Sequence, residues 1–238
     1  MHREVGIVRS TRRARLLATL AVASAVLAAA CQAGVWAGPA TGAKVSVIGD
    51  SLVHHAEGNH DGGPLRRLLA DELVAAGYQS HVSGYVGKTV EGGYHDLWSL
   101  VAHEPELDTL VIALGTNDLH NGIPLEDSRA ALRRWLDETG GLRCVALVGI
   151  NVHATAWNFD VLAPPFNAML AEEAARRDNV IVADWDPAED IRPADGTAHM
   201  DTEAGYAQYR ATIHDAVDRC ALRPAPTTTT TTNEVPTP

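Results

Sequence analysis

The chain has 238 residues, of which 46% are hydrophobic and 21% are charged, a composition typical of a globular protein rather than a disordered one. Its formal net charge of −11 argues against a general nucleic-acid binder, because such a protein would normally carry a basic face. Three cysteines are too few for a small domain built on disulfides.

The first 31 residues have the layout of an export signal. Five arginines precede an apolar run over 16–30, which is short for a membrane span and ends in small residues. Two ways of processing stay open. Leu27 to Cys31 resembles a lipobox, with Ala28 as a departure, and would place a lipid on Cys31; ordinary cleavage after Ala30 is the alternative. Five of the 19 basic and one of the 30 acidic residues precede Cys31. Removal of this leader therefore leaves 14 basic and 29 acidic residues, a net charge of −15.

Short apolar strands alternate with helical segments after this leader. The predicted strands are 44–49, 79–83, 109–114, 143–150 and 179–183. The predicted helices are 64–76, 97–102, 125–136, 166–177 and 202–219. This alternation predicts an α/β fold with a parallel sheet covered on both faces. Because ligands bind such sheets at the carboxyl ends of the strands, the site is expected in the loops that directly follow them.

The end of the chain differs in composition from the rest. Residues 223–238 are rich in Pro and Thr and include six consecutive threonines. Such a segment buries little and stays extended, which predicts a disordered tail. We therefore expect a linker over 32–42 and a single folded domain over 43–222.

A serine, an asparagine and a histidine occupy three of the loops after the strands. Ser51 lies in the tetrapeptide GDSL after the first strand, where a tight turn would expose its hydroxyl, although Asp and Ser are also common helix caps. Asn117, in GTND after the third strand, can donate to an oxyanion or close an Asx turn. His199 follows the fifth strand with Asp195 before it, and is either a base oriented by a carboxylate or a solvated loop histidine.

Taken together, GDSL at 49–52, Gly87, GTND at 115–118 and Asp195 with His199 resemble the four sequence blocks of the SGNH (GDSL-type) hydrolases. The resemblance covers about residues 44–216, and flanking phrases such as VIALGTND look like secreted actinobacterial members and the SGNH domains of cell-wall acyltransferases. The family implies a flavodoxin-like three-layer α/β/α sandwich with a five-stranded parallel sheet. It implies no cofactor and no metal.

The resemblance also assigns roles. It makes Ser51 the nucleophile, His199 its general base and Asp195 the acid that orients the histidine. The oxyanion hole would consist of the backbone N–H groups of Ser51 and Gly87 and the side-chain amide of Asn117.

The spacing of the acid and the base departs from the family pattern. The family usually places two residues between them, whereas three intervene between Asp195 and His199. On a helical turn the two would still share a face, but in an extended loop they would lie roughly 13 Å apart. Asp201 and Asp186 are therefore kept as alternative acids.

Two further groups of residues invite a role. His54, His55, His60 and Asp61 crowd the segment after Ser51, but their spacing matches no known metal site, and we expect solvated or substrate-facing side chains. Trp157 and Phe159 follow the fourth strand and either contact an acyl group or sugar ring, or pack the loop.

Two cysteines lie far from the predicted site. Cys144 begins the fourth strand and Cys220 ends the last helix. In an exported protein, two such leftover cysteines predict a disulfide.

The sequence thus predicts an exported serine esterase that acts through an acyl-enzyme on small acyl esters of carbohydrate or cell-wall polymers. Hydrolysis of lipid esters or thioesters, O-acyl transfer to an alcohol with the same triad, and an inactive SGNH-fold binding domain are the alternatives. No nucleic-acid partner is expected. Contact with a membrane is expected only through a lipid on Cys31.

Overall fold

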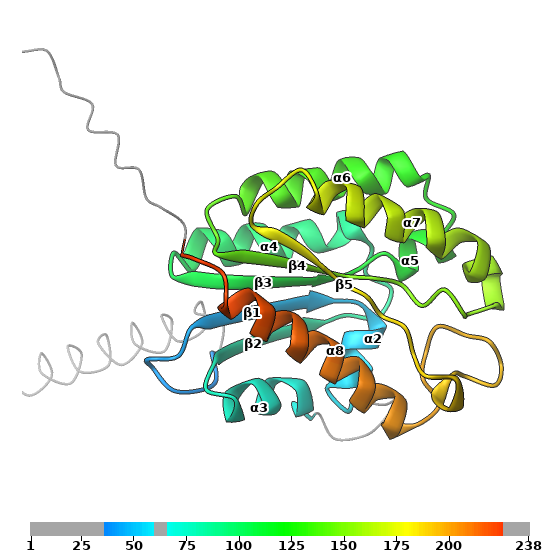
Figure 1. Ribbon diagram of the computed structural model, residues 1–238, viewed down its shortest axis with the longest axis horizontal. Coiled ribbons are helices and arrows are strands. Elements are labelled where there is room, and N and C mark those ends of the chain that lie inside the picture. Colours follow the sequence, from blue (N-terminus) through cyan, green and yellow to red (C-terminus); the bar gives the residue numbers. More distant parts are fainter. Residues whose placement is uncertain (1–35, 60–65, 226–238) are drawn as a thin grey trace, which may run out of the picture. The chain divides into compact units, whose positions relative to one another are not determined.

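The computed structural model describes residues 36–59 and 66–225, and the fold is that of the unit that begins at Ala37 (Figure 1). The predicted export signal with Cys31, residues His60 and Asp61, and residues 226–238 of the predicted tail lie outside the described residues.

Five parallel strands form one sheet in the order β2-β1-β3-β4-β5. Their bounds are β1 Lys44–Gly49, β2 Gln79–Gly84, β3 Leu107–Ala113, β4 Cys144–Val148 and β5 Val180–Ala183. The order reverses between β1 and β3, which makes that point of the carboxyl edge the expected ligand site. Gly49 is paired in register with Gly84 on one side and Ala113 on the other, so these three strands end level.

Helices cover both faces of the sheet, as predicted for a three-layer α/β/α fold (Figure 1). One face carries α4 Val90–His103, α6 Leu125–Glu138 and α7 Phe159–Ala174. The other carries α2 Ser51–Ala56, α3 Leu68–Ala75 and α8 Glu203–Ala221. The short helix α5 Thr116–His120 follows β3, and single 3₁₀ turns lie at η1 Ala156–Asn158 and η2 Glu189–Ile191.

The core follows from the period-two alternation of the strands. Val45 and Val47 of β1 belong to the layer of apolar side chains beneath α8, where Tyr209 and Ile213 are buried. On the opposite face Trp135 of α6 is fully buried, and its indole N–H donates to the carbonyl of Val90. Burial on both faces explains why the strands are apolar almost throughout.

Two helices begin earlier than predicted. The glycine-rich stretch before residue 97 was expected to be a loop, but α4 begins at Val90, and the Thr89 hydroxyl accepts the N–H of Gly92 as a cap. Gly93 is required inside this helix because a Cβ there would lie 2.7–2.8 Å from Leu114 and Trp135. The helix predicted from residue 166 begins at Phe159, whose ring is fully buried.

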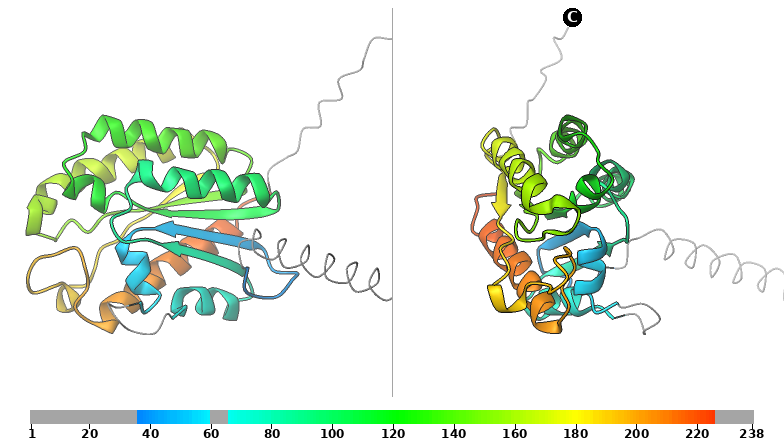
Figure 2. Two further views of the ribbon diagram at one scale, coloured as in Figure 1. Left: turned by 180° about the vertical axis from the view of Figure 1, so that it is seen from behind. Right: turned by 90° about the vertical axis from the view of Figure 1, so that its right-hand side faces the viewer.

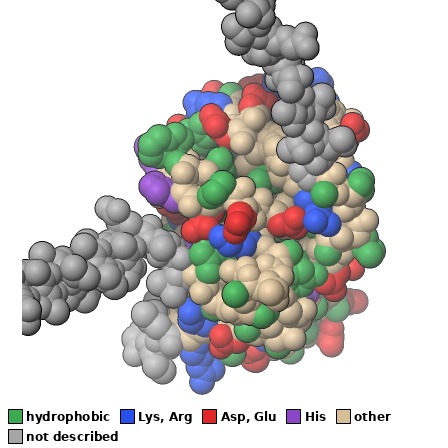
Figure 3. Space-filling model, turned by 90° about the vertical axis from the view of Figure 1, so that its left-hand side faces the viewer, with side chains coloured by type: hydrophobic (Ala, Val, Ile, Leu, Met, Phe, Trp, Pro, Cys, Tyr) green, Lys and Arg blue, Asp and Glu red, His purple; other side chains and the backbone are tan. Residues whose placement is uncertain are grey.

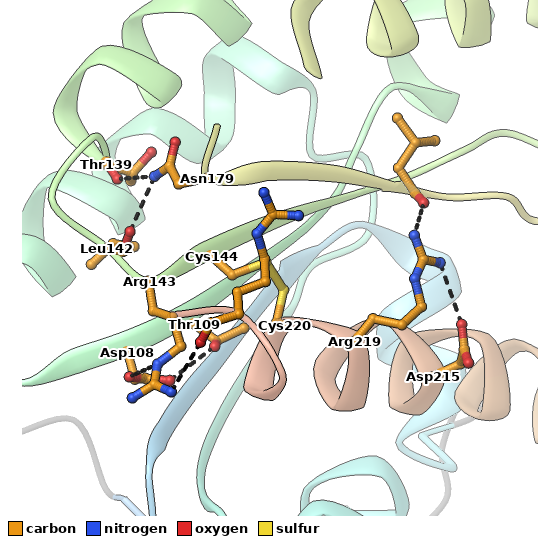
Figure 4. The surroundings of a disulfide bond; sticks show 12 residues. Asp108, Thr109, Thr139, Leu142, Arg143, Cys144, Asn179, Asp215, Arg219 and Cys220 are labelled. Carbon is orange, nitrogen blue, oxygen red and sulfur yellow. Dashed lines mark hydrogen bonds and ion pairs between the residues drawn. A yellow bond between two sulfur atoms is a disulfide. The ribbon is translucent and has the colours of Figure 1, made fainter. Parts of the chain in front are cut away.

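The predicted disulfide is present between Cys144 and Cys220 and joins the start of β4 to the end of α8 (Figure 4). Beside it, Arg143 donates to the Asp108 carboxylate across 2.9 Å. This edge holds the amino ends of the strands, where acidic and basic side chains lie next to one another on the surface (Figure 3).

Candidate functional site

The segments that bear the predicted site residues meet at the carboxyl end of the sheet. Helix α2, the turn η1 and the segment before α8 all lie at this end, which faces the viewer in the right-hand view of Figure 2. Because β1, β2 and β3 end level, the first residues after each of them are neighbours.

Ser51 is the first residue of α2 and lies within hydrogen-bond distance of His199. Its Oγ is 2.7 Å from Nε2 of the imidazole, although 148 residues separate the two in sequence. Asp50 caps the helix by accepting the N–H of Leu52. The N–H of Ser51, in the first turn, has no acceptor within the helix and is available to a ligand.

A tight turn brings Asp195 near His199. The Asp195 carboxylate accepts the N–H of Thr197 across 2.9 Å, and Gly196 between them adopts φ +72°, in the left-handed region that favours glycine. The chain is therefore neither helical nor extended here. Asp195 is exposed, and it influences His199 through its charge; within the described residues no carboxylate is hydrogen-bonded to the imidazole.

The pKa values of the pair follow from this environment. Burial lowers the pKa of His199 below 6.5, and the negative charge of Asp195 opposes that shift. The hydrogen bonds from Thr197 lower the pKa of Asp195, with a smaller effect from His199. The histidine is thus neutral near pH 7 and able to accept a proton, while the aspartate is ionised.

The two alternative acids have other partners. Asp186 accepts from His153 across 2.8 Å and pairs with Arg192 at 3.7 Å. Asp201 accepts the N–H of Ala194 across 3.1 Å. Of the three aspartates considered, Asp195 is therefore the one whose charge acts on His199.

Gly87 follows β2 and Asn117 follows β3, the two strands that pair with β1. Asn117 is the second residue of α5, and its Nδ2 donates to the carbonyl of Lys88 across 3.0 Å. An amide has two donor hydrogens, and among the described residues only the Lys88 carbonyl accepts from this one, so the second hydrogen can donate to an oxyanion. Gly87 adopts φ +81°, a left-handed backbone conformation in which most other residues would be strained.

Two buried carboxylates lie beneath these loops. Burial raises the pKa of Asp50 to about 7, and the charge of nearby Asp118 adds to the shift. Asp118 accepts the N–H of Val90 and the hydroxyl of Ser128, at 2.9 and 2.8 Å. These bonds tie the loop after β3 to the starts of α4 and α6 and so fix the position of Asn117.

His55 and Tyr206 are neighbours of His199 that the sequence did not single out as a pair. The rings of His55 and His199 are 5.2 Å apart, and Nδ1 of His55 is 2.9 Å from the hydroxyl of Tyr206. Burial raises the pKa of the Tyr206 hydroxyl, whereas the Met200 backbone, next to His199, acts on the hydroxyl to lower it. Since His55 follows Ser51 by four residues, helical spacing could have placed it on the same face.

The described residues contain no group of three or more His, Cys, Asp or Glu side chains that could hold a metal ion. None of the helices described is long and apolar enough to cross a membrane. A cavity of about 620 Å³ lies at the opposite, amino end of β4 and β5, where Arg143, Arg177 and Asn179 line it.

Comparison with known families identifies the family of this chain. Residues 47–218 match the model of the GDSL-like lipase/acylhydrolase family. The chain belongs to this family. It is an SGNH-type serine esterase, and the predicted family and fold are confirmed. Among curated proteins, no sequence matches the chain.

Several solved SGNH structures share the fold. The catalytic domain of peptidoglycan O-acetyltransferase A from Streptococcus pneumoniae, with a methylsulfonyl adduct, superposes with a TM-score of 0.59 at 18% identity, over 77% of this chain and 97% of that one. A catalytic mutant of an acetylxylan esterase from Geobacillus stearothermophilus gives 0.59 at 16% identity, over 76% and 96%. A lipase/acylhydrolase from Enterococcus faecalis gives 0.56 at 20% identity, over 77% and 98%.

Proposed function

We propose that this GDSL-family protein is an exported esterase that removes small acyl groups from carbohydrate or cell-wall polymers through an acyl-enzyme. The observation that carries the proposal is the 2.7 Å contact between Ser51 Oγ and His199 Nε2 at the switch point of the sheet. A neutral histidine at that distance can accept the serine proton as the hydroxyl attacks an ester.

The proposed reaction assigns each of these groups a step. Ser51 Oγ bonds to the ester carbonyl carbon while His199 takes its proton, and the carbonyl oxygen becomes an oxyanion. When the tetrahedral species collapses, the ester C–O bond breaks and His199 returns the proton to the leaving alcohol. Water then attacks the acyl-enzyme in the same two steps, and the acid and free Ser51 are released.

Three donors would stabilise the oxyanion in this scheme. They are the backbone N–H groups of Ser51 and Gly87 and the second hydrogen of the Asn117 amide. Asp195 would stabilise the protonated His199 through its charge. Such donors act most strongly on the charge that develops in the transition state, which is where they lower the barrier.

The substrate class rests on fold neighbours and on the chain itself. Two of the neighbours are named for O-acetyl chemistry on peptidoglycan and for acetylxylan esterase activity. The arginine-rich leader with its apolar run and the Cys144–Cys220 disulfide favour an oxidising, extracytoplasmic location. We include in the proposal the export signal over 1–31, with or without a lipid on Cys31, and a tail over 223–238.

Hydrolysis of p-nitrophenyl esters of increasing acyl length, with Ser51→Ala as the control, tests the proposal. We expect turnover that depends on Ser51 and is fastest with acetyl. A preference for long acyl chains would favour a lipase or thioesterase instead. Absence of serine-dependent turnover at every length would favour an inactive binding domain. Mass spectrometry of the exported protein tests whether Cys31 is the lipidated first residue.

Acyl transfer is the second candidate, and the likeness to the peptidoglycan O-acetyltransferase domain favours it. The acyl-enzyme is the same in both reactions, and only the acceptor differs. Adding a saccharide as acceptor to the p-nitrophenyl acetate assay separates them, because a transferase would form acetylated saccharide in excess of free acetate.

A further inference from the structure

Most of the exposed large apolar side chains follow strands at the carboxyl end of the sheet. In the part of the chain that the structure describes, seven large apolar residues are more than a third exposed, and five of these follow β2 or β4. They are Tyr85, Val86, Trp157, Val161 and Leu162. Trp157 is the largest of the five, and 49% of its surface is exposed.

The backbone of Trp157 is in a conformation that bulky residues rarely adopt. Its φ is 58° and ψ 22°, and Asn158 after it is also left-handed at φ 60°. Such strain persists only where the surroundings hold it, and it is concentrated at functional sites. Here the buried ring of Phe159 anchors one side, and on the other the Ala156 N–H donates to the carbonyl of Gly196 across 2.9 Å.

Trp157 lies next to two parts of the catalytic site, the turn that carries His199 and the helix that carries Asn117. Gly196 lies in the turn between Asp195 and His199. On the other side, the indole packs edge to face on the ring of His120, with centroids 4.4 Å apart. His120 ends α5, the short helix that carries Asn117. These two contacts therefore fix the position of Trp157 with respect to both the general base and the oxyanion donor.

The surroundings of the indole suit an amphipathic ligand. His120 packs on the half-exposed indole, and Asn158 and Asp160, which are close to Trp157 in sequence, are exposed, so polar side chains accompany an apolar ring on this surface. A pyranose ring has this character, since its C–H bonds form an apolar face and its hydroxyls a polar rim. An acyl chain would instead call for an enclosed apolar pocket.

We propose that Trp157, held against His120 and anchored through Gly196, stacks on a sugar ring of the alcohol part of the ester and so determines specificity for carbohydrate esters. This inference rests on the proposed esterase function. It assigns the residue a role in binding the polymer and none in the bond-breaking steps.

The test compares two acetyl esters in the full chain, an acetylated xylo-oligosaccharide and triacetin, which has no ring. Trp157→Asn removes the indole and keeps a residue that tolerates the left-handed backbone. We expect the ratio of kcat/KM for the oligosaccharide to that for triacetin to fall about 3- to 10-fold, mainly through KM. Trp157→Tyr should restore most of the ratio. The matched control is Trp98→Ala, which removes an exposed tryptophan from α4.

An unchanged ratio in Trp157→Asn would overturn the inference. So would a larger loss on tributyrin than on triacetin, because the residue would then recognise the acyl chain.

A binding measurement separates this failure from that of the esterase proposal. Calorimetric titration of Ser51→Ala with deacetylated xylo-oligosaccharide needs no turnover. The affinity should be at least about threefold weaker when Trp157→Asn is added. Equal affinities, or no binding to either protein, would overturn the inference even if the enzyme hydrolyses triacetin.

Discussion

The ring of His55 lies against the ring of His199, 5.2 Å between centroids, and the hydroxyl of Tyr206 holds it there from 2.9 Å. Burial raises the pKa of the same hydroxyl, and the Met200 backbone is close enough to oppose that shift. One phenol therefore holds the imidazole beside the proposed base and lies next to the chain that follows that base.

Tyr206→Phe removes this hydroxyl and keeps the ring. We expect kcat for p-nitrophenyl acetate to fall about 10-fold with little change in KM, because small misplacement of a catalytic group raises the barrier more than it weakens binding. Tyr209→Phe is the matched control on the next turn of α8, where the ring is buried against Trp185. An equal loss in both variants would indicate a general effect on α8 rather than positioning of His199.

Asp195→Asn tests the proposed acid through the pH profile. The base must be neutral, so activity is lost as the pH falls through the pKa of His199, which burial already holds below 6.5. The charge of Asp195 raises that pKa, so its removal should move the acidic limb of kcat/KM to still lower pH. We also expect the plateau to fall about 10-fold or more.

The measurement is kcat/KM for p-nitrophenyl acetate from about pH 4 to about pH 9, where the substrate tolerates the conditions. Asp186→Asn and Asp201→Asn serve as controls and should leave the acidic limb in place. If one of these moves the limb and Asp195→Asn does not, the acid is misassigned.

Asn117→Ala removes the proposed side-chain donor of the oxyanion hole. Loss of one such donor costs about 10²- to 10³-fold in kcat. The neighbouring Asn121→Ala, which changes an exposed asparagine, should leave kcat within about twofold, as surface substitutions usually do. An Asn117→Ala enzyme that loses its rate wholly through KM would show that the amide orients the loop through Lys88 and does not act on the oxyanion.

Removal of the disulfide should affect stability and leave catalysis intact. Cys144→Ala with Cys220→Ala opens a link across a sequence separation of 76 residues, which lowers the free energy of unfolding by about 4 kcal/mol in the chain-entropy model. The melting temperature, measured by circular dichroism, should fall by about 8 to 16 °C. Because the link lies at the amino end of β4, kcat of the folded variant should match the wild type; a large loss of kcat with unchanged melting would contradict this view.

The pattern of the sequence was sufficient for the layers of the fold. The strand predicted at 44–49 matches β1 in full, because apolar runs of that length have few other ways to be buried. The early starts of α4 and α7 escaped prediction because glycine and proline have low helix propensity, and Gly92, Gly93, Pro164 and Pro165 lie in these segments. Packing of Gly93 against Trp135 favours the helix in α4, and burial of Phe159 favours it in α7.

The site, like the fold, was predictable from the sequence in part only. GDSL, GTND and the Asp195–His199 pair were recognisable in the chain, and the order of the strands implied that they meet. Only the tertiary structure decided that a glycine turn brings the charge of Asp195 near His199, that Asp186 is bonded to His153, and that Tyr206 is bonded to His55, 151 residues away in sequence. Sequence periodicity determines which face of an element is buried, whereas contacts between distant side chains depend on how the strands and helices are brought into register.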